Sequence, residues 1–199
     1  MASLLTLAGA TAILVLIPGP NVALIVANSI RFGFRMGAIT VLGTTFGVAI
    51  QLAAVVLGMA AIIELAAEAL TWVRWAGVAY LIYLGIRTWR EPPDDLRKII
   101  AAPAMFWRGC MIAAANPKTL LFHAAFLPQF VSADGASSGQ LLLVAATFLS
   151  VLLLGDMLWA LSAGAARPLL DRFATARNRL SGGFLVAAGV GLALSQRDT

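Results

Sequence analysis

The sequence predicts an all-α integral membrane protein with six transmembrane helices, arranged as two inverted three-helix repeats in which helices 1 and 4 are broken by proline. Composition is the first observation: 61% of the 199 residues are hydrophobic and only 12% are charged, whereas soluble domains average about 45–50% and about 25%. The second is six apolar stretches long enough to span a bilayer. The third is a pair of proline breaks in corresponding places of the two halves, a pattern typical of transporters.

The first span covers about residues 4–30 and contains no charged residue. Its middle reads Pro18-Gly19-Pro20-Asn21. Each proline lacks an N–H and clashes with a carbonyl one turn earlier, at about 3 kcal/mol in a helix interior. Freed carbonyls are tolerated at membrane depth only where protein or a water-filled cavity satisfies them. We therefore expect a broken helix whose break faces a polar cavity; the alternative is a simple proline kink without a ligand.

The other five spans follow at regular intervals. They cover about residues 37–63, 70–89, 106–131, 139–165 and 180–196. The fourth contains Asn116-Pro117-Lys118, which is a second proline break beside an asparagine. We expect one transporter domain over residues 1–199, with repeat 1 at about 1–90, a cytoplasmic linker at about 91–104 and repeat 2 at about 105–199.

Basic residues are concentrated in alternate loops, after spans 1, 3 and 5. Eleven of the 14 Lys and Arg residues lie there: Arg31, Arg35, Arg87, Arg90, Arg97, Lys98, Arg108, Arg167, Arg172, Arg177 and Arg179. The positive-inside rule places these loops in the cytoplasm and both termini outside. The net charge of +5 is therefore a membrane-topology signal, and we expect no nucleic-acid partner.

Polar side chains of five spans are predicted to lie at one depth. Asn21, Thr45, Tyr80 and Lys118 are each 10 residues from a basic residue at a cytoplasmic span end, and Asp156 is 11 residues from one. At 1.5 Å per residue this is roughly 15 Å, about half of the hydrocarbon core. We expect a midplane substrate site there, formed by Pro18, Gly19, Pro20, Asn21, Thr44, Thr45, Tyr80, Asn116, Pro117 and Lys118, with Asp156 as the proton-coupling residue.

Several of these residues have a purely structural alternative. The hydroxyls of Thr44 and Thr45 can bond to carbonyls of their own helix, and Tyr80 can be a packed aromatic. Lys118 and Asp156 are different, because a charge at the midplane costs about 2.5–3.5 kcal/mol and indicates function.

Three neighbouring features can also be either structural or functional. Gly43 and Gly47 form a GxxxG pair that is typical of close helix packing. Gln51 can join helices or contact substrate, and for His123 a packing role is favoured.

The motifs together resemble the LysE/RhtB family of amino-acid exporters. They are Pro18-Gly19-Pro20-Asn21, the segment Gly77 to Gly85 (GVAYLIYLG), and Asn116-Pro117-Lys118 followed by Phe126 to Phe130 (FLPQF). The resemblance covers nearly the whole chain and is closest to the homoserine/threonine-type branch. It implies a multi-pass exporter of the bacterial inner membrane, driven by proton antiport. Some relatives carry an aspartate just after the second glycine of span 2; here that position is Val48, which places more weight on Asp156.

Two other functions were weighed against a secondary exporter. A passive channel for small polar solutes would use the same polar layer without dependence on a proton gradient. A membrane thiol-electron carrier needs a cysteine pair, and the chain has only Cys110. No GxxxxGK[ST] nucleotide-binding loop is present. We expect no enzyme activity, cofactor or metal. The expected partners are a small-molecule substrate and the lipid bilayer. The identity of the substrate and the formation of a homo-oligomer do not follow from the sequence.

Overall fold

A computed structural model describes residues 4–58, 75, 78–90, 101–126, 130, 138–171 and 174–194. Within these residues the protein is helical and contains no strand. The helices are α1 (Leu4–Leu16), α2 (Pro20–Phe32), α3 (Phe34–Gly58), α5 (Ala102–Ala114), α6 (Pro117–Phe126), α7 (Ser138–Asp171) and α8 (Ala174–Leu194), and residues 78–90 form a further helical stretch. The predicted ends of spans 2 to 4, and residues 92–95 of the linker, lie outside the described residues.

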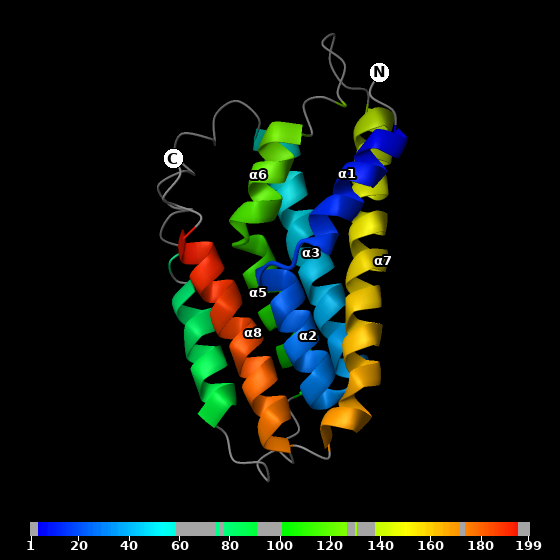
Figure 1. Cartoon of the computed structure of the whole chain (residues 1–199). Helices are drawn as coiled ribbons and strands as arrows, with labels where there is room; N and C mark the ends of the chain where they lie inside the picture. The colour runs from blue at the N-terminus through cyan, green and yellow to red at the C-terminus, as the bar shows by residue number, and fades with distance from the viewer. Residues whose placement is uncertain are drawn as a thin grey trace.

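The helices form one elongated bundle (Figure 1). The start of α1 lies at one end of it, and the end of α2, the end of α7 and the start of α8 lie at the other; α8 runs from there toward the α1 end. By length and composition, α3 and α7 can each cross a membrane, and α1 with α2 can form one broken span. The described part therefore agrees with an all-helical integral membrane protein.

The first proline break is present and sharp. α1 ends at Leu16, α2 begins at Pro20, and their axes differ by 59°. Gly19 precedes α2 in an extended conformation, and Pro20 takes the first helical position. An N–H at that position would have no partner within the helix, so a proline is tolerated there. The sequence prediction of a broken first span is confirmed.

The second break occurs where the sequence predicts it. α5 ends at Ala114, and α6 begins at Pro117, so that proline again occupies the first helical position. α5 itself begins at Ala102, which is inside the stretch expected to be linker. The predicted proline break at Pro117 is therefore confirmed.

α3 and α5 make the closest helix contact of the described part. A Cβ on Gly43 or Gly47 would collide with the backbone carbonyls of Phe106 or Cys110, and one on Gly109 would come within 2.7 Å of the Thr40 carbonyl. The GxxxG pair therefore allows the close packing of α3 against α5. It holds α5, and so the start of the second break, firmly against α3.

α7 positions the remaining part of the site. It packs against α1, α2 and α3, and it carries Asp156 in its middle. Above the breaks, the fully buried ring of Phe148 on α7 joins α1 and α3 in an apolar core that includes Leu7 and Val48. The position at which some relatives carry an aspartate is therefore occupied by core packing in this chain.

Candidate functional site

The two breaks are joined by their asparagines. Asn116 Nδ2 donates a hydrogen bond of 3.0 Å to Asn21 Oδ1. Both side chains are buried, with 3% and 5% of their surfaces exposed. A buried amide needs partners for its N–H and C=O groups, and here each break supplies one to the other. Two of the residues that the sequence assigns to the site therefore meet directly.

Asn116 also fixes the start of α6. Its Oδ1 accepts a hydrogen bond of 3.0 Å from the backbone N–H of Lys118. Asparagine is a favoured N-cap because its side-chain oxygen satisfies a free N–H in the first turn. With Pro117 in the first helical position, the local sequence Asn-Pro-Lys specifies both the break and the new helix.

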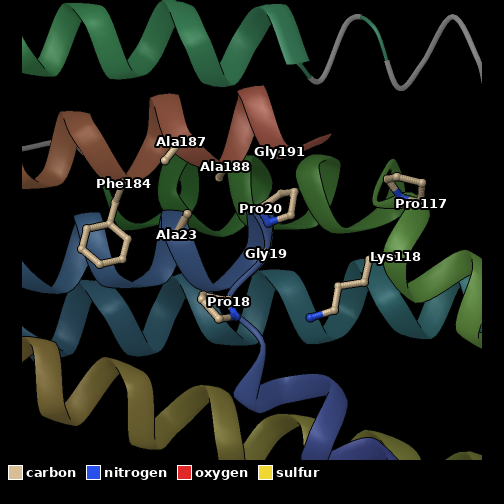
Figure 2. A pocket seen from close by; sticks show the side chains of 10 residues that line it. All are labelled: Pro18, Gly19, Pro20, Ala23, Pro117, Lys118, Phe184, Ala187, Ala188 and Gly191. Atoms are coloured by element: carbon tan, nitrogen blue, oxygen red, sulfur yellow. The ribbon is translucent and has the colours of Figure 1, made fainter. Parts of the chain in front are cut away.

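Side chains from other helices satisfy the carbonyls that the first break frees. Lys118 Nζ donates to the Leu14 carbonyl at 2.6 Å and also to the Ile17 carbonyl. Trp159 Nε1 on α7 donates to the Val15 carbonyl at 3.2 Å. Figure 2 shows Lys118 extending from α6 toward the break at Pro18 and Gly19. The end of α1 is thus tied to both α6 and α7.

The second break has its own donors on α3 and α6. Gln51 Nε2 donates to the Ala114 carbonyl at 2.9 Å and to the Asn116 carbonyl at 3.1 Å. Thr119 Oγ1 lies 2.7 Å from Gln51 Oε1 and 3.0 Å from the Asn116 carbonyl. Of the two roles open to Gln51, the structure shows the joining of helices.

Sequence reasoning did not assign Thr119 or Trp159 to the site. They could have been found only indirectly. Carbonyls freed at membrane depth need hydrogen-bond donors, and few side chains in the uncharged spans can donate.

Asp156 on α7 is almost fully buried, with 1% of its surface exposed. Its Oδ2 has no hydrogen-bond partner within the described part of the chain. Asp156 lines a cavity of about 20 Å³ together with Asn21, Asn116, Lys118 and Thr119. A volume of this size holds about one water molecule. With Gly19, which also lines it, the structure gathers five of the predicted site residues around one small cavity.

A larger cavity of about 470 Å³ lies on the α8 side of the breaks. Its lining comprises Pro18, Gly19, Pro20, Ala23, Pro117, Lys118, Phe184, Ala187, Ala188 and Gly191, all labelled in Figure 2. The volume falls in the range of about 300–1,000 Å³ that is usual for small-molecule sites. Both α2 and α6 begin at this cavity, so the partial positive charges of two helix N-termini act on it. Gly19 and Lys118 border both cavities.

Three predicted residues lie outside the lining of both cavities. Thr44 Oγ1 donates to the Val41 carbonyl of its own helix at 2.9 Å. Thr45 Oγ1 is buried without a hydrogen-bond partner among the described residues. Tyr80 packs against a core that includes Leu24 on α2. For Thr44 and Tyr80 the observed contacts are those of the structural alternatives.

His123 has the surroundings of a packing residue. It is fully buried on α6, and its ring centroid lies 4.7 Å from that of Phe148 in an edge-on arrangement. Across the residues that the structure describes, no group of three or more His, Cys, Asp or Glu side chains could hold a metal ion.

Comparison with known proteins gives one family and several relatives. The family described as LysE type translocator matches residues 12–196. The uncharacterized membrane protein YrhP of Bacillus subtilis (strain 168) is 29% identical over 174 residues, which is 81% of each chain.

Two relatives carry functional names. A homoserine/homoserine lactone efflux protein of Salmonella typhi is 31% identical over 143 residues, covering 70% of this chain and 69% of the relative. A leucine efflux protein of Salmonella choleraesuis (strain SC-B67) is 28% identical over 143 residues, covering 69% and 68%. No solved structure gave a significant match.

Proposed function

We propose, because this chain belongs to the family of LysE type translocators, that it is a secondary active exporter of amino acids or related small metabolites. Family membership makes it a membrane transport protein and not an enzyme. Relatives named for the efflux of homoserine, homoserine lactone and leucine support the substrate class. We further propose that it resides in a bacterial inner membrane and works by proton antiport, with its site at the two helix breaks.

The observation that carries the proposal is the Asn116–Asn21 hydrogen bond, because it brings the two broken helices to one point. Inverted-repeat transporters bind substrate where discontinuous helices meet near the midplane. The proposed architecture is accordingly six spans in one transporter domain, with repeats at about 1–90 and 105–199 and both termini outside the cell. The matching positions of the breaks, at Pro20 and Pro117, support this arrangement.

Lys118 offers a way to bind a zwitterion. In the structure its ammonium group is held by the carbonyls of Leu14 and Ile17, at the end of α1. A substrate carboxylate in the larger cavity is attracted by this ammonium and by the two helix N-termini. When Lys118 turns toward the carboxylate, the two carbonyls are released and can accept hydrogen bonds from the substrate ammonium group. An amino acid matches both halves of this exchange.

Asp156 is the proposed proton-coupling group. A buried carboxylate is strongly disfavoured in its ionised form unless a cation or hydrogen bonds compensate it. Lys118 is the cation that borders the same small cavity. Movement of Lys118 toward substrate removes this compensation, and either the substrate ammonium group or a proton can then replace it. Because one compensating charge suffices, substrate and proton compete at Asp156, as antiport requires.

Transport in reconstituted vesicles tests the function. Vesicles loaded with labelled homoserine, threonine or leucine are assayed for release with and without a proton gradient. We expect the proton gradient to accelerate release of at least one of them. The Asp156→Asn variant is expected to lose gradient-driven transport while keeping exchange. Thr147→Val is a matched control, since Thr147 lies on the same helix and its exposed hydroxyl bonds only to its own helix among the described contacts. Conductance without dependence on the gradient would instead identify a passive channel.

A further inference from the structure

A third cavity lies away from the helix breaks, where three arginines from three different elements converge. Arg31 comes from α2, Arg87 from the helical stretch 78–90, and Arg108 from α5. The cavity has a volume of about 110 Å³. It lies at the end of the bundle where α2 ends (Figure 1), which is the end rich in basic residues.

Two buried polar side chains complete the lining. Asn28 and Thr88 have only 8% and 3% of their surfaces exposed, and both border the cavity. Arg31 Nη1 donates to Thr88 Oγ1 at 3.4 Å, and Asn28 Nδ2 donates to Thr40 Oγ1 at 2.9 Å. These contacts tie α2 to its neighbours on both sides. Asn28, Arg31 and Thr88 are thus held in place by contacts within the protein.

The chemistry of this lining selects an oxyanion. Guanidinium groups bind phosphate and carboxylate oxygens through paired, charge-assisted hydrogen bonds. The described residues that line the cavity include no carboxylate.

The size of the cavity further restricts which ligands can bind. At about 110 Å³ it is smaller than the roughly 300 Å³ lower bound of typical small-molecule sites, so it fits one anionic group better than a whole metabolite. Basic pockets between transmembrane helices, at the level of the headgroups, bind the phosphates of anionic lipids. We propose that Arg31, Arg87 and Arg108 form a binding site for a phosphate oxyanion, supplied by the headgroup of an anionic phospholipid.

The site is independent of the transport site. It shares no lining residue with the two cavities at the helix breaks. An anion bound here stabilises the junction of α2, α5 and the stretch 78–90, and its removal does not by itself abolish substrate binding at Lys118.

Thermal unfolding of the purified full-length chain tests the site. The protein is mixed with phosphatidylglycerol, phosphatidylcholine or inorganic phosphate in detergent, and the midpoint of unfolding is measured as each additive is titrated. We expect phosphatidylglycerol to raise the midpoint and phosphatidylcholine to leave it unchanged. Arg108→Gln should weaken the apparent affinity for phosphatidylglycerol by about fivefold, the effect of one basic residue near an anionic surface.

Two controls separate this site from general surface charge. Arg35→Gln and Arg179→Gln remove exposed arginines that do not line the cavity, and both should keep the wild-type response. Arg108→Lys keeps the charge but not the paired geometry, so an intermediate affinity is expected if Arg108→Gln folds poorly.

Equal protection by inorganic phosphate would support the oxyanion site while assigning it to a free anion. No response to either anion, or an equal loss in the Arg35→Gln control, would overturn the proposal.

Discussion

Asn116 donates a hydrogen bond of 3.0 Å to Asn21, a residue 95 positions earlier in the chain. Each of the two side chains stands beside a proline that interrupts a helix, so one contact sets the relative position of both interruptions. Of these two residues Asn116 has the additional role of capping α6. This asymmetry allows the structural and functional parts of the contact to be separated.

Replacing the asparagines should affect transport more than stability, and to different degrees. Asn21→Ala removes the contact between the breaks, whereas Asn116→Ala also removes a helix cap worth roughly 0.5–2 kcal/mol. Asn116→Ser keeps a capping oxygen but is too short to reach Asn21. We expect Asn116→Ser to have near wild-type thermal stability with impaired export, measured as melting temperature and vesicle flux. Normal export by both Asn21→Ala and Asn116→Ser would show that the breaks are only structural.

Lys118 and Asp156 should be energetically coupled. Lys118→Met leaves the carbonyls of Leu14 and Ile17 without their donor and leaves the carboxylate of Asp156 uncompensated. Stability should fall by about the 1–3 kcal/mol that an unsatisfied buried polar group costs. Adding Asp156→Leu should recover much of the lost stability but no proton-driven export. A double-mutant cycle on unfolding free energy measures the coupling; strictly additive effects would show that the two charges act separately.

Gln51 should stabilise the second helix break. Gln51→Leu preserves size but leaves the Ala114 carbonyl without the donor seen in the structure. An unsatisfied buried acceptor costs about 1–3 kcal/mol, and the Asn116 carbonyl retains Thr119 as a partner. We expect a lower melting temperature and a second break that exchanges amide hydrogens faster. Unchanged exchange at residues 114–120 would place the stabilising effect elsewhere.

Topology is testable without purification. Because 11 of the 14 basic residues fall in alternate loops, a reporter fused after Thr199 should be active outside the cytoplasm, and one inserted between Pro92 and Asp95 should be active inside it. α8 runs from the end of the bundle where α2 and α7 end toward the end where α1 starts (Figure 1), which agrees with an even number of spans. A cytoplasmic C-terminus would contradict the six-span arrangement.

The breaks could be predicted from sequence because proline acts locally. Pro20 and Pro117 lack an N–H wherever the chain places them, so a helix must start anew at each. Charges at membrane depth are equally visible, which is why Lys118 and Asp156 stood out. The partners of these groups were not visible. That Lys118 bonds to the carbonyls of Leu14 and Ile17 depends on how α6 packs against α1, and sequence spacing does not encode this.

Counting residues predicts the depth of a side chain better than it predicts whether that side chain lines the site. Counting residues from the basic span ends fixes the height of a side chain along its helix, but not the direction in which the helix is rotated. The count places Tyr80 and Thr45 in the layer, and Thr44 is next to Thr45. In the structure Tyr80 faces an apolar core and the hydroxyl of Thr44 bonds to its own helix. Gln51 reaches the second break because its side chain points toward α5 and α6.

The glycine contact between α3 and α5 limits how this exporter can move. At Gly43, Gly47 and Gly109 the two backbones touch with no side chains between them. α3 belongs to the first half of the chain and α5 to the second, so this contact crosses the proposed repeat boundary. A transport cycle that keeps the contact is not a simple rocking of one half against the other. The helices around α3 and α5 are then the ones that move, with α1 and α6 hinging at their own proline breaks.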